Sequence, residues 1–371
     1  MNRLVPVPDA IARLPWRLYV LLIVLASFGA IVLYSAAGGH VTPWAGMQMV
    51  RFSIFLVMAE VISRVPFRYI RMSAFPIYGV VLVALFLVEL IGGVAGGSQR
   101  WINLGFMQLQ PSEFMKVAIV LAVARFYALL PSAFIRTFMA IWPSLVLIGM
   151  PVLLVLLQPD LGTASMIGFG GVTVMFLAGL PLRLFVSAGL AGAALIPIAF
   201  SFLHEYQQKR VLIFMDPESD PLGAGYHISQ SKIAIGSGGL FGKGFLNGTQ
   251  SHLDYLPEGH TDFVFATMAE EWGMMGGLAL IIALFLLLRW GMRVAQRTED
   301  RFARLVAGGL TTTIFLYIAI NLMMVMGMAP VVGIPLPFMS YGGSSMLTVM
   351  LCVGIIMNID RNRKALGERW P

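Results

Sequence analysis

The sequence of residues 256–266 is LPEGHTDFVFA, and it joins an acidic loop to the start of an apolar segment. Thr261 is a residue type that caps helix N-termini, and the hydrophobic run begins at Phe263. We therefore predict that a helix starts here, with Asp262 in its first turn. A carboxylate in that position feels the positive end of the helix dipole and stays ionised. Such a group next to a membrane acts as a general base or holds a divalent cation, or it only stabilises the helix start.

The composition places this segment in a membrane protein. The 371 residues are 58% hydrophobic and only 12% charged, and long apolar runs recur along the whole chain. This pattern is typical of polytopic membrane proteins. With about 20 residues per span, we predict ten transmembrane helices. They cover residues 18–36, 45–63, 73–92, 113–130, 139–157, 161–180, 184–203, 263–288, 303–326 and 341–359.

The predicted fold class is thus an all-α polytopic membrane protein, with residues 1–371 forming one ten-span membrane domain. The first apolar run starts at Leu18 and is longer than the ~7–15 residues of a signal-peptide core, so we interpret it as a retained anchor. The only cysteine, Cys352, lies in the last apolar run, which excludes an intrachain disulfide.

Basic residues collect in alternate connections and indicate an orientation. The two terminal segments and every second connection hold 18 of the 25 lysines and arginines. Such residues stay on the cytoplasmic side, so both termini are expected there. The other connections then face outward and contain all five histidines. We attribute the net charge of +7 to this asymmetry and expect no nucleic-acid partner.

One outward connection, residues 204–262, is far longer than a turn, and such connections are usually functional. It mixes acids and bases with apolar stretches such as residues 211–215, so we predict short amphipathic helices on the membrane face. Its residues 238–244 (GGLFGKG) look like a phosphate loop. However, Ser237 and Gly244 stand where the Walker pattern requires Gly and Ser or Thr. We exclude nucleotide binding, and the histidine spacing excludes an HExxH zinc site.

Charged residues in or beside the spans are unfavourable unless they pair or line a polar cavity. Glu113 and Lys116 lie three residues apart on one predicted helix face, and each can simply neutralise the other. Four such residues can gather near Asp262 on the outward side: Arg100, Glu113, Lys116 and Asp160. This gathering favours a polar site for a lipid with a charged headgroup. We assign no function to Arg51 or Glu60 in the second span.

Several motifs of this chain resemble the SEDS family (shape, elongation, division and sporulation). They are residues 110–116, 158–163, 256–266 with 270–273, and 335–345, and they occur in order along the whole chain. Residues 248–253 are more similar to the elongation branch, typified by RodA, than to the division branch, typified by FtsW.

The resemblance implies a peptidoglycan glycosyltransferase of the bacterial cytoplasmic membrane that polymerises lipid II during cell elongation. It implies a class B penicillin-binding protein and other elongation-complex membrane proteins as partners. It also implies that Asp262 is the key aspartate, whereas Gly259 stands where a larger, often basic, residue is expected. The substrate-binding residues that it implies are Arg100, Glu113, Lys116, Asp160, Arg210, Lys232 and Glu258.

Inverting transfer from a polyprenyl diphosphate needs a base for the acceptor hydroxyl and positive charge for the leaving diphosphate. Asp262 suits the first role, and the second falls to a divalent cation (Mg²⁺ or Mn²⁺, ligands unassigned) or to Lys116, Arg210, Lys232 and Arg100. Two alternatives stay open: a flippase for the same lipid, and a non-catalytic scaffold for a penicillin-binding protein. A flippase needs polar residues through the full membrane depth, whereas these charges cluster at the outer end. This difference favours the enzyme.

Overall fold

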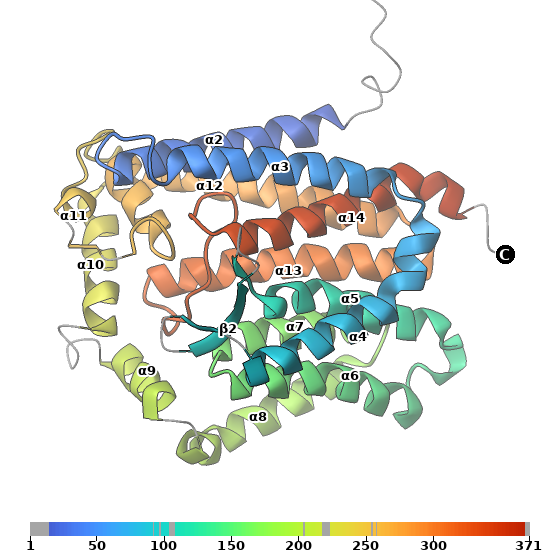
Figure 1. Ribbon diagram of the computed structural model, residues 1–371. Helices are drawn as coiled ribbons and strands as arrows, with labels where there is room; N and C mark the ends of the chain where they lie inside the picture. Colours follow the sequence, from blue (N-terminus) through green and yellow to red (C-terminus); the bar gives the residue numbers. More distant parts are fainter. Residues whose placement is uncertain are drawn as a thin grey trace, which may run out of the picture.

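The computed structural model of the protein describes residues 15–91, 93–95, 98–103, 108–202, 205–216, 223–253, 255–256 and 258–367. Within these ranges, ten long helices form the body of the molecule, and the axes of most of them are roughly aligned with one another in Figure 1. They are α2 (Trp16–Ala36), α3 (Ala45–Arg64), α4 (Phe67–Ile91), α5 (Pro111–Leu129), α6 (Phe138–Leu157), α7 (Leu161–Leu177), α8 (Leu182–Phe202), α12 (Val264–Arg297), α13 (Arg301–Val325) and α14 (Gly343–Gly367).

Each of the ten predicted spans coincides with one of these helices, so the all-α fold class is confirmed. Seven of them are long and apolar enough to cross a membrane, namely α2, α3, α4, α6, α12, α13 and α14. The apolar parts of α7 and α8 are shorter, and α5 carries Glu113, Lys116 and Arg125. Large apolar side chains are exposed on the outer helices; Val57 of α3 is 65% exposed and Val80 of α4 is 70% exposed. Such a surface suits contact with lipid.

Three shorter helices occupy the long connection between α8 and α12. They are α9 (Glu205–Met215), α10 (Ala224–Ser237) and α11 (Thr249–His252). The short helices expected in residues 204–262 are therefore present. All three lie toward one end of the bundle, whereas both ends of the described chain lie at the other (Figure 1). A single 3-10 turn, η1 (Ser132–Phe134), precedes α6.

A small antiparallel sheet, which the sequence did not predict, lies between α4 and α5. Its strands are β1 (Gly93–Ala95), β2 (Ser98–Asn103) and β3 (Gln108–Leu109), in the order β1-β2-β3. Val94 faces Gln99 across the first pair, and Ile102 faces Leu109 across the second. Strands of two to six residues carry too little period-2 pattern to be seen in the sequence.

The core of the protein surrounds α13. This helix packs against α12 and α14 on one side and against α5 and α7 on the other (Figure 1). On α5, every residue from Met115 to Ala124 is buried. A helix that is buried all round needs neighbours on every side. The buried polar side chains on α5 and α13 must therefore find their partners inside the bundle.

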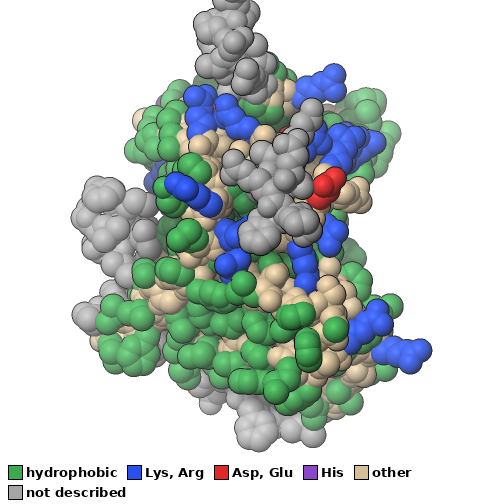
Figure 2. Space-filling view, turned by 90° about the vertical axis from the view of Figure 1, so that its right-hand side faces the viewer, with side chains coloured by type: hydrophobic (Ala, Val, Ile, Leu, Met, Phe, Trp, Pro, Cys, Tyr) green, Lys and Arg blue, Asp and Glu red, His purple; other side chains and the backbone are tan. Residues whose placement is uncertain are grey.

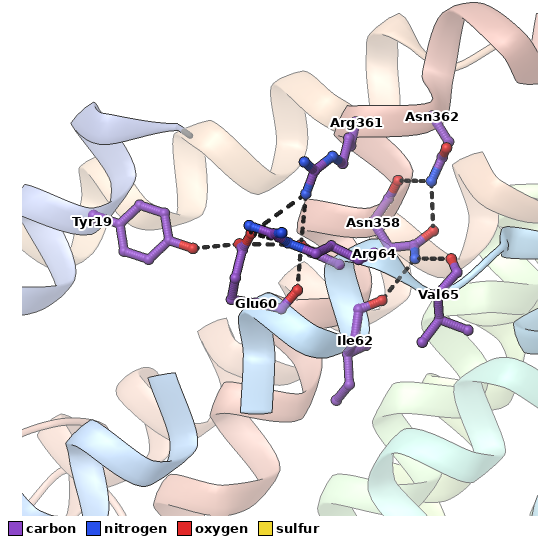
Figure 3. A network of polar contacts seen from close by, with 9 residues as sticks. Tyr19, Glu60, Ile62, Arg64, Val65, Asn358, Arg361 and Asn362 are labelled. Atoms are coloured by element: carbon purple, nitrogen blue, oxygen red, sulfur yellow. Dashed lines mark hydrogen bonds and ion pairs between the residues drawn. The ribbon is translucent and has the colours of Figure 1, made fainter. Parts of the chain in front are cut away.

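The side chain of Glu60 on α3 connects α2, α3 and α14 at the end where the described termini lie (Figure 3). Its carboxylate accepts hydrogen bonds from the Tyr19 hydroxyl of α2 at 2.5 Å and from Arg64 Nε at 2.6 Å. Arg361 Nη1 of α14 lies 3.4 Å from the same carboxylate. Asn358 of α14 adds two hydrogen bonds to backbone carbonyls at the end of α3. These contacts join the helices and explain why a carboxylate is present in the second span.

Helix α12 is broken at Gly273, where φ is 63° and ψ is −164°. The break leaves carbonyls on one side and N–H groups on the other without helical partners. Residues 238–244 supply the missing hydrogen-bond partners. Lys243 N and Gly244 N donate to the carbonyls of residues 270 and 271, and the N–H groups of residues 274 and 275 donate to the carbonyls of residues 239 and 240. We call this segment the helix clip. It explains the glycine-rich stretch that resembled a phosphate loop.

Buried carboxylates fix the helix clip to the short half of α12. Glu270 is 0% exposed and forms a 2.6 Å ion pair with Lys243. It also accepts hydrogen bonds from the N–H groups of Thr249 and Gln250 and from the Thr249 hydroxyl. The neighbouring Glu271 accepts from the Ser35 hydroxyl of α2. The half-helix that follows Asp262 is thus held by polar contacts at its far end.

Gly238→Ala is expected to destabilise the protein by about 1–3 kcal/mol, the usual effect of overpacking. A Cβ atom at this position would lie 2.1 Å from the backbone oxygen of Ala269, which cannot move without α12. The matched control is Gly236→Ala, two residues earlier in α10, where a Cβ meets nothing within 4 Å. It is expected to be neutral or to stabilise by up to ~1 kcal/mol. Thermal unfolding in detergent compares the two, and equal midpoints would contradict the clip.

Candidate active site

Asp262 lies in the turn that leads into α12, not in the helix. The helix starts at Val264, and its N-cap is Phe263 without a side-chain cap. The prediction that Thr261 caps the helix is wrong, because its hydroxyl donates to the Glu258 side chain at 2.5 Å. One residue, Phe263, therefore separates Asp262 from the first helical residue. Tertiary contacts determine its placement.

The first of these contacts is with residues 326–342, which join α13 to α14 and which we call the α13–α14 loop. A Cβ atom on Gly333 of this loop would lie 3.5 Å from Oδ2 of Asp262. Asn321 of α13 is 0% exposed and donates to the carbonyl of Asp262 at 2.8 Å and to that of Ile334 at 2.7 Å. One buried amide therefore fixes the backbone of Asp262 against the loop.

Two more helices reach the same loop. Gln48 of α3 is fully buried and donates to the carbonyl of Ser340 at 2.9 Å. At the start of α7, a Cβ atom on Gly162 would lie 3.0 Å from both Cβ and the carbonyl oxygen of Val332. The loop thus joins α3, α7, α13 and the Asp262 turn at the end of the bundle that also holds α10 and α11 (Figure 1).

Asp160 caps α7 beside this loop. Its Oδ1 accepts a 3.0 Å hydrogen bond from the N–H of Thr163, and its Oδ2 lies 3.4 Å from Nε2 of Gln110, the residue before α5. The carboxylate is only 8% exposed. Asp160 therefore joins the starts of α5 and α7 and lies two residues from the Gly162 contact. The structure therefore places Asp160 at the same end of the bundle as Asp262, as expected from the sequence.

Lys232 and Glu258 border the loop and the Asp262 turn from the outside. A Cβ atom on Gly327, where the loop begins, would lie 2.8 Å from the Lys232 ammonium nitrogen. Both side chains are exposed. Arg100 lies on β2 and Arg210 lies on α9, but their side chains fall outside the described part of the structure. The substrate roles of all four residues stay predictions.

Glu113 and Lys116 are inside the bundle. Lys116 is 1% exposed and Glu113 is 6% exposed. The lysine donates to Glu113 at 2.6 Å and to the Tyr317 hydroxyl of α13 at 2.9 Å, and Tyr317 donates to the other oxygen of Glu113. This triad uses both oxygens of the Glu113 carboxylate. It explains how two charges fit into a buried helix, and the assignment of the pair to the substrate stays a prediction.

Aromatic stacking supports the turn before Asp262. The His260 ring stacks on Trp44 with 4.0 Å between centroids, and the His260 carbonyl accepts from the N–H of Tyr341 at 2.9 Å. Burial lowers the pKa of His260 below its usual 6.5, against the opposing charge of Glu258. The ring is neutral at pH 7, and stability from this state is lost as the pH falls from 6.5 through the lowered pKa.

Arg51 of α3 is another cation at this end. Its guanidinium carbon lies 4.6 Å from the centroid of the Tyr341 ring, an aromatic contact of the cation–π type. Through Tyr341 it is connected to the His260–Asp262 turn. The sequence assigns no function to Arg51, because it lies nine positions from Glu60 on roughly the opposite face of the helix, which indicates structural partners on other helices.

Replacing Asn321 by Leu is expected to lower any activity that depends on the Asp262 carboxylate by up to ~10²-fold, the effect of a misplaced reacting group. It leaves two backbone carbonyls unpaired, which costs about 1–3 kcal/mol each. The matched control is Asn358→Leu, because Asn358 is also buried and also donates to two carbonyls, at the opposite end. Equal specific activity of the two folded variants would show that Asn321 has no special link to Asp262.

The sequence reasoning missed Asn321, Gln48 and Tyr341. A signal was present for the first two, because an amide in an apolar helix must find a partner. The sequence pattern did not indicate which groups Asn321 and Gln48 would contact. No group of three His, Cys, Asp or Glu side chains within the described residues could hold a metal ion.

Comparison with known proteins identifies the family. The profile of the FtsW/RodA/SpoVE family, described as cell cycle protein, matches residues 14–365. The chain belongs to this family. The peptidoglycan glycosyltransferase MrdB of Escherichia coli K12 is 46% identical over 360 residues, which cover 95% of each chain. MrdB of Helicobacter pylori strain 26695 is 37% identical and covers 86% of this chain and 84% of its own length.

Solved structures agree with this placement in the FtsW/RodA/SpoVE family. A chain from a peptidoglycan synthase complex, solved to show how polymerization and crosslinking are coordinated, superposes with a TM-score of 0.82 at 32% identity. RodA of Thermus thermophilus superposes with a TM-score of 0.70 at 29% identity. Both matches cover 95% of this chain and 98% of the other. The resemblance to the SEDS family and its elongation branch is confirmed, and the chain is a multi-pass membrane protein.

Proposed function

We propose that this chain is a peptidoglycan glycosyltransferase that polymerises lipid II during cell elongation, with Asp262 as the general base. The observation that carries the proposal is the fixed position of Asp262, whose carbonyl is held by Asn321 and whose carboxylate lies against Gly333. Similarity to relatives named peptidoglycan glycosyltransferase supports the activity.

In this reaction the acceptor's 4-hydroxyl oxygen attacks C1 of the donor sugar from the side opposite the diphosphate. The proton of that hydroxyl passes to the Asp262 carboxylate as the new C–O bond forms. The bond between C1 and the diphosphate oxygen breaks, and the polyprenyl diphosphate leaves with the electron pair. Because a diphosphate leaves as an anion, no carboxylic acid has to protonate it.

Positive charge must stabilise the leaving diphosphate. Lys232 suits this role, because it is exposed and lies at Gly327, on the same loop that contacts Asp262. Arg100 and Arg210 are further proposed contacts. A divalent cation is also proposed: Mg²⁺ commonly binds one or two carboxylates plus substrate phosphates, so the diphosphate would supply part of its ligands and a cluster of three protein ligands would not be needed.

We propose that the reacting end faces outward and that both termini are cytoplasmic. Lys and Arg side chains gather on the face at the right of Figure 1, which Figure 2 shows directly. The α9–α11 region and the α13–α14 loop lie toward the opposite end. The positive-inside rule then puts the arginine-rich face in the cytoplasm.

Reporter fusions test this orientation. A reporter fused after Arg297 is expected to read cytoplasmic, as is one fused at the C-terminus. One inserted at Ser219, in the long connection, is expected to read outside. An outside reading at either of the first two sites would contradict the ten-span topology.

As partners we propose a class B penicillin-binding protein and other membrane proteins of the elongation complex. The structural similarity to a chain of a peptidoglycan synthase complex supports the first of these. The pairing is chemically sensible, because new glycan strands need a transpeptidase to crosslink them. The lipid substrate itself reaches the protein through the membrane.

The test of the proposed function is glycan formation from labelled lipid II by the purified chain, alone and with its penicillin-binding partner. Detergent solution is used because translocation has no meaning there. Polymer on a gel supports the enzyme. Absence of polymer, together with transport of the lipid II headgroup across vesicles that contain the chain, would establish the flippase instead. Absence of both would leave the scaffold.

A further inference from the structure

Within the described residues, Arg51 of α3 has no counter-charge. The other charged residues of this helix, Glu60 and Arg64, pair with each other at 2.5 Å. Arg51 lies in the second turn of α3, a helix apolar enough to cross a membrane, and its side chain is half-buried. Its guanidinium forms neither an ion pair nor a hydrogen bond with the described part of the chain. A charge in a membrane span that no partner neutralises indicates a polar binding site.

Two contacts direct the Arg51 side chain toward the end of the α13–α14 loop. Its guanidinium carbon lies 4.6 Å from the centroid of the Tyr341 ring. A Cβ atom on Gly343, the first residue of α14, would lie 3.4 Å from that carbon and from Nη1. The ring carries no net charge, and the start of a helix carries partial positive charge. The five N–H donors of the guanidinium are therefore available to an anionic acceptor.

The α13–α14 loop connects Arg51 to the proposed base. The N–H of Tyr341 donates to the carbonyl of His260 at 2.9 Å, two positions before Asp262. The loop has Arg51 beside its last residues and Lys232 beside its first, and the Asp262 turn contacts its middle. Helix α3 begins at the end of the bundle that holds α10 and α11 (Figure 1). Two cations therefore flank the proposed base at the two ends of one loop.

The proposed reaction brings together two lipids that each carry a diphosphate. The donor's diphosphate leaves, and Lys232 is proposed to stabilise it. The acceptor keeps its diphosphate, which is separated from the reacting 4-hydroxyl by the sugars of the headgroup. A second cation at another place along the loop is suited to hold this group. A guanidinium fits the role, because it can donate two parallel hydrogen bonds to phosphate oxygens.

We propose that Arg51 binds the diphosphate of the acceptor lipid and thereby holds the acceptor's 4-hydroxyl toward Asp262. The Tyr341 ring keeps the guanidinium at the loop. The inference rests on the proposed function for the identity of the lipid. Its anion chemistry is tested by binding alone, without the reaction.

The test is a titration of the full-length purified chain with undecaprenyl diphosphate, followed by native mass spectrometry. Undecaprenol, which has the same chain but no anion, is the neutral probe. Two diphosphate lipids are expected on the wild type. Arg51→Gln should weaken one of them by about 10- to 100-fold, the range for loss of a hydrogen bond to a charged group. Arg51→Lys should keep part of the affinity, because an ammonium still offers a point charge to phosphate.

The matched control is Arg68→Gln. Arg68 also lies over an aromatic ring, with 4.8 Å between its guanidinium carbon and the Tyr69 centroid, but near the start of α4 and the other end of α3. This substitution should leave both bound lipids unchanged. Thermal unfolding checks that all variants are folded.

Steady-state polymerisation separates substrate binding from support of the fold. Arg51→Gln should raise the lipid II concentration that gives the half-maximal rate, and the maximal rate of the folded enzyme should change little. A residue that only supports the fold would instead lower the thermal midpoint and leave that concentration unchanged, which would overturn the proposal.

Three binding results would also overturn it: wild-type affinity in Arg51→Gln, equal weakening by Arg68→Gln, or equal weakening of undecaprenol. Failure of the proposed function looks different. A wild type that binds two diphosphate lipids, one of them through Arg51, but forms no glycan from lipid II would refute the glycosyltransferase and keep the diphosphate site.

Discussion

Asp262→Asn is expected to lower glycan polymerisation by about 10²–10⁴-fold, the range for loss of a positioned general base. Asn has the same size as Asp but cannot accept the proton or neutralise a cation. The contact from Asn321 reaches the backbone carbonyl of residue 262, so it survives the substitution. The readout is glycan length from labelled lipid II in detergent, with variant and wild type at equal folded concentration.

Glu258→Gln, at the other acid of the turn and itself a predicted substrate contact, is the comparison for this substitution. Glu258 is an acid of the same turn, but its side chain is exposed and accepts from Thr261. We expect a much smaller loss of polymerisation than for Asp262→Asn. Both variants should insert, accumulate and bind the penicillin-binding partner as the wild type does. Glycan chains of wild-type length from Asp262→Asn would remove Asp262 from the base role and reopen the flippase interpretation.

Lys116→Met is expected to destabilise the protein by about 3–5 kcal/mol, because it leaves the buried Glu113 carboxylate without its cation. The Tyr317 hydroxyl remains as a donor but carries no charge. The measurement is the thermal midpoint and the yield of monodisperse protein. A variant as stable as wild type would mean that Glu113 is already neutral or hydrated.

The double variant Glu113→Gln/Lys116→Met separates structure from substrate binding. It removes both charges and keeps a neutral side chain near Tyr317, so most of the lost stability should return. If activity returns with it, the triad is structural. If the double variant is stable but inactive, the charges contact the substrate, as the family resemblance implies.

The ten long helices could be predicted because each carries a long run of apolar residues, and the observed bounds differ mainly at the ends. The break within α12 could not be predicted in this way. The predicted span covers residues 263–288 without a break, although Glu270, Glu271 and Gly273 lie within it. The break depends on residues 238–244, which supply hydrogen bonds from outside the segment.

The sequence predicted Asp262 as the key residue of the candidate site, but it did not predict the residues that hold Asp262 in place. Asp262 stands out because it is the last acid of the long outward connection and directly precedes an apolar run. Its support comes from Asn321, Gly333 and Tyr341, which lie about 60 to 80 positions further along the chain. Without an alignment, nothing in the sequence pairs residues at that distance. The prediction of Thr261 as the N-cap was wrong for a different, local reason, because its hydroxyl donates to the Glu258 side chain.

Photo-crosslinking of lipid II to chosen positions tests most directly whether the reaction takes place at Asp262 and the α13–α14 loop. Benzoylphenylalanine at Met328, which is 65% exposed on this loop, is compared with the same residue at Met292, which is exposed in the second half of α12. Labelled lipid II is expected to form an adduct at position 328 that unlabelled lipid II suppresses, and none at position 292. An adduct confined to position 292, or equal adducts at both positions, would contradict the account.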